Sequence, residues 1–104
     1  MNKYVVAQLT AGETVTIHPR GSSMEPLIKS GQEVILEPVR GRLEVDDIVL
    51  ARVNGQLYLH KVLAVDGQRV QIGNNKGHVN GWTSAFRVYG RVTASTFTPP
   101  GVQP

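Results

Sequence analysis

Cysteine is absent from this chain of 104 residues, and its absence excludes several kinds of protein. Without cysteine the chain can form neither a disulfide framework nor a thiolate metal site. A cysteine-free sequence is compatible with a reducing compartment, so we expect a cytoplasmic protein. The histidines His18, His60 and His78 lack the compact spacing of a metal-ligand set. We therefore expect neither a metal nor any other cofactor.

Long apolar runs are also missing. The longest one near the N-terminus is Tyr4-Val5-Val6-Ala7. A helix that spans a membrane needs about 18 apolar residues, and the core of a signal peptide needs about 7–15. We therefore expect no membrane span.

The chain has only a small excess of positive charge, and it has few aromatic residues. The formal net charge is +3, and the lysines and arginines are scattered with few aromatics between them. Surfaces that bind nucleic acids usually cluster their cations and add stacking rings. We interpret Trp82, Phe86 and Tyr89 as packing residues and expect no nucleic-acid partner, which leaves a nucleic-acid-binding β-barrel as a remote alternative.

A long amphipathic helix is not predicted, because the apolar residues alternate mostly with a period of two. The sequence predicts an all-β fold, mostly antiparallel and coiled like a small barrel, with one short helical turn after residue 23. The pairs Asn54-Gly55 and Asp66-Gly67 favour tight hairpin turns within an antiparallel meander. We expect strands over residues 3–9, 14–18, 33–37, 48–53, 57–65, 69–72 and 86–93.

The length of the chain limits its organisation to one modest hydrophobic core. We predict a single domain over residues 1–98. Residues 99–104 have too little apolar surface to pack and are rich in proline, so we expect a loose tail there.

The first candidate for chemistry is the segment 21–26, which reads Gly-Ser-Ser-Met-Glu-Pro. A serine hydroxyl becomes a good nucleophile when a neighbouring base takes its proton and fixed donors await the oxyanion. Gly21 permits a positive φ, and Pro26 fixes the backbone beyond the serine and can open a helical turn. We predict Ser23 as the nucleophile, with its own N–H facing the oxyanion. The neighbours predicted to bind oxyanion or substrate are Gly21, Ser22 and Met24.

The second candidate lies on the predicted strand 57–65, where His60 and Lys61 are adjacent and therefore point to opposite faces. One of them can face Ser23 as its base. A lysine on a leucine-rich face becomes a base if burial lowers its pKa, although it can also extend its charge to water. Histidine is already largely neutral at pH 7. We therefore predict His60 as the base and keep Lys61 as the alternative.

Together the two segments resemble the superfamily of LexA-like self-cleaving repressors and type I signal peptidases. Its G-x-S-M motif coincides with Ser23 and Met24. His60-Lys61-Val62 is similar to the H-R-V run of archaeal and endoplasmic-reticulum-type signal peptidases, where most bacterial members have lysine as the base. Residues 29–36 and 45–50 resemble the family's "G-D-x-V-x-V" and "G-D-I-V" strands. The resemblance covers residues 14–92 and implies a coiled β-fold with a Ser–His or Ser–Lys dyad.

An acidic residue that orients the histidine, as the resemblance implies, is not evident in the matching loop 73–82. The amides of Asn74, Asn75 or Asn80 could accept a hydrogen bond from the ring, but an amide stabilises imidazolium less than a carboxylate does. We interpret this loop in the first place as a Gly/Asn-rich turn. Asp46 and Asp47 are interpreted as the end of a loop before a strand.

The leading hypothesis is a soluble serine endopeptidase-like domain that cuts an extended polypeptide with a Ser23–His60 dyad. The alternative is a catalytically impaired fold that binds a partner protein or forms a homodimer, in a phage- or stress-related setting. Ala11-Gly12 resembles the dipeptide at which LexA-like proteins cut themselves. Because the chain between Gly12 and Ser23 is short and partly committed to a strand, we do not expect self-cleavage.

Overall fold

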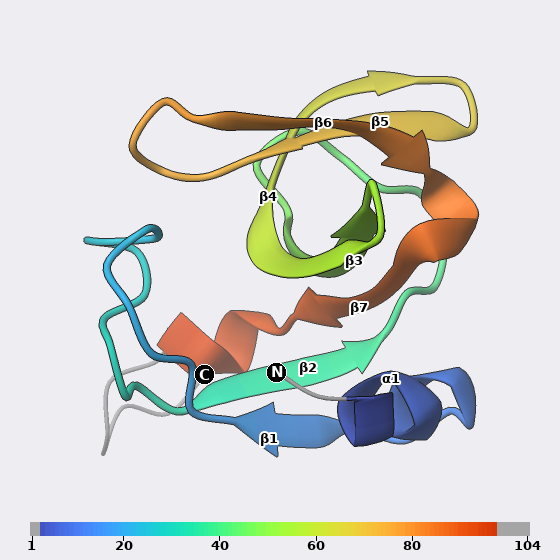
Figure 1. Ribbon diagram of the computed structural model, residues 1–104. Coiled ribbons are helices and arrows are strands. Elements are labelled where there is room, and N and C mark those ends of the chain that lie inside the picture. The colour runs from blue at the N-terminus through green and yellow to red at the C-terminus, as the bar shows by residue number, and fades with distance from the viewer. Residues whose placement is uncertain (1–2, 98–104) are drawn as a thin grey trace.

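The computed structural model describes residues 3–97, which form one antiparallel sheet of seven strands with a short helix packed on it (Figure 1). The order of strands across the sheet is β1-β2-β7-β3-β4-β5-β6. The strands are β1 (Val15–Ile17), β2 (Val34–Pro38), β3 (Ile48–Val53), β4 (Gln56–Asp66), β5 (Arg69–Gly73), β6 (Val79–Ser84) and β7 (Val88–Val92). The predicted all-β fold is confirmed, while the predicted tail 99–104 lies outside the described residues.

The expected meander is found in β3 to β6, which follow one another in the chain and in the sheet. The first hairpin turns at Asn54-Gly55, and both residues have a positive φ, of 49° and 82°. Asparagine and glycine tolerate this conformation, so the sequence pair specifies the turn. In the second hairpin Asp66 pairs with Arg69, and the turn lies one residue later than expected, with Gly67 in the positive-φ position.

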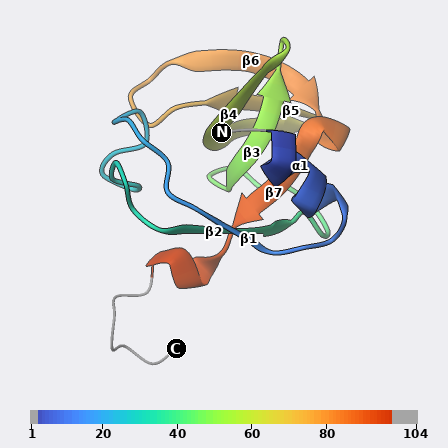
Figure 2. The same cartoon turned by 60° about the horizontal axis from the view of Figure 1, so that its bottom comes forward.

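The sheet curls strongly along β3 to β6, and Figure 2 shows this half of the molecule from a second direction. The register shifts once between β4 and β5, and once between β5 and β6. Such bulges increase the local twist of a sheet. The curl brings β6 back to β3, where Thr83 Oγ1 donates a hydrogen bond of 2.7 Å to the carbonyl of Arg52.

Two groups of buried side chains fill the two faces of the curled sheet. The first is Leu9, Val15, Ile17, Met24, Ile28, Val34, Leu36, Ile48, Leu50, Leu59 and Val92. The second is Val49, Ala51, Val53, Val62, Val70, Ile72 and Val88. The alternating residues of β3 contribute to both groups, as expected for a central strand that is covered on both faces.

The N-terminal segment corrects the sequence prediction, because α1 (Lys3–Thr10) is a helix where a strand was expected. Val5 and Val6 lie one helical turn before Leu9, and all three face the first buried group, in which Leu9 is 2% exposed. A run of four residues does not separate a strand from one helical turn. Gly90 of β7 lets the helix approach, since a Cβ there would lie 2.8 Å from Leu9 Cδ1.

Two further predictions need correction near the C-terminal half of the sheet. The stretch 73–82 was interpreted as a turn, but its second part is the edge strand β6. The last predicted strand begins later than expected, because a 3-10 turn, η1 (Ala85–Arg87), precedes β7. A second 3-10 turn, η2 (Ala94–Phe97), follows β7.

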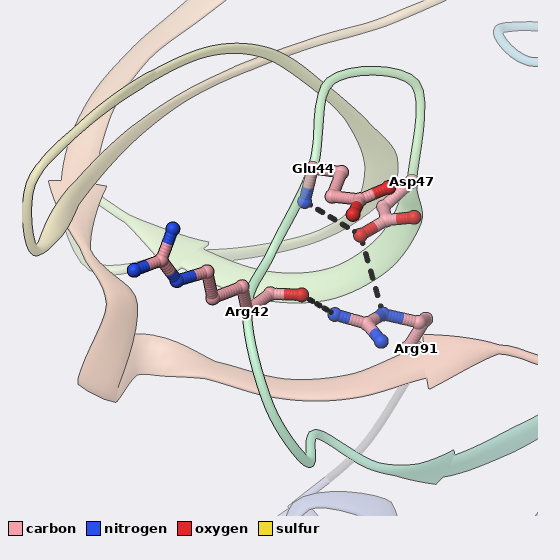
Figure 3. Close-up of polar contacts among 4 residues, drawn as sticks. All are labelled: Arg42, Glu44, Asp47 and Arg91. Carbon is pink, nitrogen blue, oxygen red and sulfur yellow. Dashed lines mark hydrogen bonds and ion pairs between the residues drawn. The ribbon is translucent and has the colours of Figure 1, made fainter.

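The loop before β3 is fastened to β7 by charged and polar groups (Figure 3). Asp47 Oδ2 lies 3.3 Å from Arg91 Nε and accepts a hydrogen bond of 2.8 Å from the backbone N–H of Glu44. The same guanidinium donates through Nη2 to the carbonyl of Arg42. Asp47 therefore has a structural role in this loop. Within residues 3–97, no helix has the length and apolar character needed to cross a membrane.

Candidate functional site

Ser23 lies on the long loop between β1 and β2, which Figure 1 shows at the left of the molecule in blue to cyan. Two hydrogen bonds close the base of this loop. Gly31 N–H donates to the carbonyl of Pro19 at 2.7 Å, and Gly21 N–H donates to Ser30 Oγ at 3.0 Å. Gly21 has a φ of 113°, a conformation that glycine adopts at little cost. The sequence motif thus sits in a closed loop.

A turn follows the serine, as predicted, and fixes its position. Glu25 N–H donates to the carbonyl of Ser22 at 3.1 Å, and Ile28 N–H donates to that of Met24 at 3.0 Å. The side chains of Met24 and Ile28 are 4% and 3% exposed and belong to the first buried group. Ser23 itself stays half-buried, because the residues on its C-terminal side are anchored in the core.

The structure brings Ser23 and His60 together, although they are 37 residues apart in the chain. Ser23 Oγ lies 3.3 Å from His60 Nε2. His60 is on β4 and is 8% exposed. The ring of Tyr58 stacks on the imidazole, with 5.2 Å between the centroids and 19° between the planes. The distance suits a hydroxyl and its base before a substrate arrives.

Asn80 of β6 fixes the orientation of the imidazole. His60 Nδ1 lies 2.6 Å from Asn80 Oδ1, and an amide oxygen can only accept a hydrogen bond. The Nδ1 atom therefore carries the proton in the neutral ring. The lone pair of Nε2 then faces the hydroxyl of Ser23, which is the tautomer that a general base needs.

The surroundings of His60 favour its neutral form. Burial lowers the pKa of His60 below its ordinary value of 6.5, because a charged ring loses hydration there. The hydrogen bond to Asn80 raises this pKa in part, and the nearby His78 lowers it again. At neutral pH the imidazole is therefore able to accept a proton from Ser23.

Lys61 points elsewhere, as the alternation of side chains along β4 requires. Its Nζ donates a hydrogen bond of 2.9 Å to Asn75 Oδ1. Asn75 in turn donates through Nδ2 to the carbonyl of Glu25 at 2.9 Å, and its backbone N–H donates to the carbonyl of Ser23 at 2.9 Å. Lys61 and Asn75 thus join β4 and the β5–β6 loop to the loop that carries the serine.

The N–H of Ser23 is available for an oxyanion. Among residues 3–97, no group accepts a hydrogen bond from it. The N–H of Gly21 is occupied by Ser30, and Gly21 and Met24 line the groove at the serine. Ser22 is exposed and is not part of the groove lining.

A groove of about 620 Å³ runs past the two side chains. Its lining comes from α1, from β1 and the residues after it, from the serine loop and from β4. The apolar side chains in it include Val5, Ile17, Met24, Ile28 and Leu57. An extended peptide could therefore reach Ser23 along an apolar floor beside the edge strand β1.

Within the described part of the chain, no cluster of three or more His, Asp or Glu side chains could hold a metal ion. Asp47 is committed to Arg91 and to the Glu44 N–H. His60 Nδ1 thus contacts the amide of Asn80, and no carboxylate of residues 3–97 is bonded to this atom.

The sequence predicted Asn80 as one of three possible hydrogen-bond acceptors for the His60 ring. It did not predict that Asn75 joins Lys61 to the serine loop. Asn74 uses its Oδ1 to bond the N–H groups of Lys76 and His78 within its own turn. The sequence feature that could have pointed to Asn75 is Lys61, because an ammonium group on an apolar strand face needs a hydrogen-bond acceptor nearby.

The comparisons with known proteins agree with the resemblance predicted from the two motifs. The model of the family described as "Peptidase S24-like" matches residues 2–93, which includes α1 and every strand of the sheet. No curated protein and no solved structure gives a significant match. The family is part of the LexA and signal peptidase superfamily of serine peptidases. With nearly the whole chain matched, this protein belongs to the Peptidase S24-like family.

Proposed function

We propose that this peptidase-like domain is a serine endopeptidase that cuts an extended polypeptide with Ser23 and His60. The observation that carries the proposal is the chain of contacts from Ser23 Oγ to His60 Nε2 at 3.3 Å and from His60 Nδ1 to Asn80 Oδ1 at 2.6 Å. Nucleophile, base and orienting group stand in the order that acyl transfer requires.

In the proposed reaction Ser23 Oγ attacks the carbonyl carbon of the scissile peptide bond, and its proton passes to His60 Nε2. The negative oxygen of the tetrahedral intermediate is held by the N–H of Ser23. Asn80 Oδ1 keeps the imidazolium in place through Nδ1–H. When the C–N bond breaks, His60 returns the proton to the leaving amine. Water then hydrolyses the serine ester, with His60 again taking a proton.

A peptide substrate would pair with the outer edge of β1, which has a neighbouring strand on one side only among the described residues and lines the groove through Thr16 and Ile17. Edge strands offer free N–H and C=O groups, which bind an extended peptide independently of its side chains. This mode of binding explains why a nucleophile placed just after an edge strand can act on polypeptides.

A fluorophosphonate probe tests the proposal, because it phosphonylates an activated serine and releases fluoride. We expect intact-mass and peptide mass spectrometry to find the adduct on Ser23. His60→Ala should lower the labelling rate about 10³-fold or more, in line with the loss of a catalytic base. Ser22→Ala is the matched control, since it removes an exposed hydroxyl that does not line the groove.

Failure to label Ser23 at any pH from 6 to 9 in correctly folded protein would overturn the peptidase proposal. The protein would then be the catalytically impaired binding module that the sequence left as the alternative. A cytoplasmic setting, a homodimer and a phage-related origin stay predictions.

A further inference from the structure

Three basic residues line the groove. They are His18, Arg20 and Lys29, which lie in the lining together with Ser23 and His60, and the described residues of this lining include no aspartate or glutamate. All three basic residues are exposed. The rest of the lining is apolar or uncharged, so these side chains set the sign of the charge that a bound peptide meets.

The closed base of the serine loop brings together the backbone segments that carry two of these cations, Arg20 and Lys29. The bonds from Gly31 to Pro19 and from Gly21 to Ser30 hold residues 19–21 beside residues 30–31. The guanidinium of Arg20 lies against Gly31, with Nη1 3.6 Å from the position of a Cβ there. Lys29 lies two residues before Gly31 in the chain. Its backbone N–H donates a hydrogen bond of 2.9 Å to Gln32 Oε1.

Among residues 3–97, neither cation has a carboxylate partner. In the part of the chain that the structure describes, Asp47 and Arg91 form an ion pair, but no carboxylate pairs with Arg20 or Lys29. Two like charges held on one closed loop repel each other. A bound anion would reduce this repulsion.

We propose that the groove selects polypeptide segments that carry an aspartate or glutamate side chain, which Arg20 and Lys29 bind while apolar neighbours contact the groove floor. The inference rests on the proposed function and names the substrate class of the same site. Because both cations are exposed, the selectivity is electrostatic and depends on salt. His18 lies in the same lining.

Matched peptides test the preference. Short fluorescent peptides of apolar and small residues would carry glutamate at each position in turn, and an isosteric series would carry glutamine. We expect the best glutamate peptide to show a kcat/KM about tenfold above that of its glutamine partner at low ionic strength, and about equal values near 1 M salt. Binding of the same peptides to Ser23→Ala, followed by fluorescence anisotropy, should show the same ratio.

Charge-removing variants assign the effect to residues. Arg20→Gln and Lys29→Gln should each remove part of the ratio, and the double variant should abolish it. Arg69→Gln is the matched control, because it lowers the net charge equally at the start of β5, outside the groove lining. The ratio should persist in this control.

The outcomes separate this inference from the proposed function. Equal binding and equal cleavage of all glutamate and glutamine pairs would overturn the acidic preference and leave the peptidase intact. Glutamate-selective binding without cleavage or fluorophosphonate labelling would support the preference and overturn the peptidase. A ratio that Arg69→Gln lowers as much as Arg20→Gln would show a general charge effect and contradict the site.

Discussion

His60 and Ser23 are held in very different ways. His60 lies on β4, an 11-residue strand paired with β3 on one side and β5 on the other. Ser23 lies on a loop that is held by the buried side chains of Met24 and Ile28 and by hydrogen bonds to Asn75. The base is fixed by strand pairing on both sides, whereas the nucleophile is fixed by two core side chains and a small number of hydrogen bonds.

This difference predicts where the site is sensitive. A rate falls about 10²-fold when reacting groups are misplaced by about 1 Å, even if the residue changed is remote from the chemistry. Changes in the β5–β6 turn, which carries Asn75, and at Asn80 on β6 should therefore affect labelling of Ser23 more than changes elsewhere in the sheet. The following variants test this view.

Gly73→Ala should have the largest effect. A Cβ at Gly73 would lie 2.4 Å from Leu63 Cδ1 and 2.6 Å from the carbonyl oxygen of His78. The His78 carbonyl is a backbone group and cannot rotate away as the end of a side chain can. The turn after β5 must therefore move. We expect a loss of about 3 kcal/mol in the free energy of unfolding, measured by urea titration, together with loss of labelling.

Gly77→Ala is the matched control for this variant. Gly77 has a φ of 90°, but a Cβ there would meet no atom within 4 Å. Backbone strain alone should cost about 1 kcal/mol. Equal losses in the two variants would mean that the clash at Gly73 does not control the turn.

Asn75→Ala should come next, with labelling of Ser23 about 100-fold slower in the folded protein. The variant removes the bond to the Glu25 carbonyl and leaves the ammonium of Lys61 without its acceptor. We also expect a loss of about 1–3 kcal/mol in stability. Rates are measured well below the unfolding midpoint, so that a change in stability alone would leave them unaltered.

Asn74→Ala provides the comparison in the same turn, because the Asn74 side chain bonds only N–H groups of that turn among the contacts described. It should lose stability with less than a threefold change in rate. Asn75→Asp keeps an acceptor for Lys61 but not the donor to Glu25. If its rate equals that of the unchanged protein, the tether to the serine loop is not what positions Ser23.

The parts of the fold that the sequence predicted are those with local signals. The bounds of β3 were predicted to the residue from its apolar run and the Asn54-Gly55 turn. The helix α1 was missed because its apolar face spans just Val5, Val6 and Leu9. The placement of β7 between β2 and β3 depends on packing between distant segments, which no local pattern encodes.

In the site, too, the features with a local sequence signal were predicted and those that depend on distant segments were not. The motif and the alternation along β4 predicted that His60 and Lys61 face apart, and the structure places His60 at Ser23. Which asparagine meets the ring could not be predicted, because β6 was interpreted as a turn. Once β6 is a strand, Asn80 lies on the sheet edge that curls toward β4, and Asn75 stays in the loop before it.

Asn80→Asp should increase labelling about tenfold at pH 8. A carboxylate stabilises the imidazolium that forms as Ser23 attacks, and the reverse change in a serine protease triad costs about 10⁴-fold. Asn74→Asp, which adds the same charge in the neighbouring turn, should change the rate much less. A rate that stays constant or falls in Asn80→Asp would show that orientation of the ring, which the amide already provides, is all that position 80 contributes.

The pH dependence of labelling tests the same contact between His60 and Asn80. Burial lowers the pKa of His60, so the unchanged protein should keep its reactivity below pH 6.5. Asn80→Asp should raise the pKa and shift the acidic limb to higher pH. The free energy of unfolding also depends on the pKa of His60. The unfolded chain binds the proton at about pH 6.5, whereas the folded chain binds it at lower pH. The unfolding free energy should therefore fall as the pH drops from about 6.5 through the folded pKa.

Asp47→Asn should have the smallest effect, and it tests whether a carboxylate outside the dyad matters. Asp47 lies 3.3 Å from Arg91 Nε, but the geometry is not that of a hydrogen bond, so the pair acts mainly by charge. The amide oxygen of asparagine can still accept from the Glu44 N–H. We expect at most about 1 kcal/mol of lost stability and no change in the labelling rate or its pH profile. A shifted acidic limb would mean that Asp47 supplies His60 with the charge that Asn80 lacks, and the loop before β3 would then belong to the site.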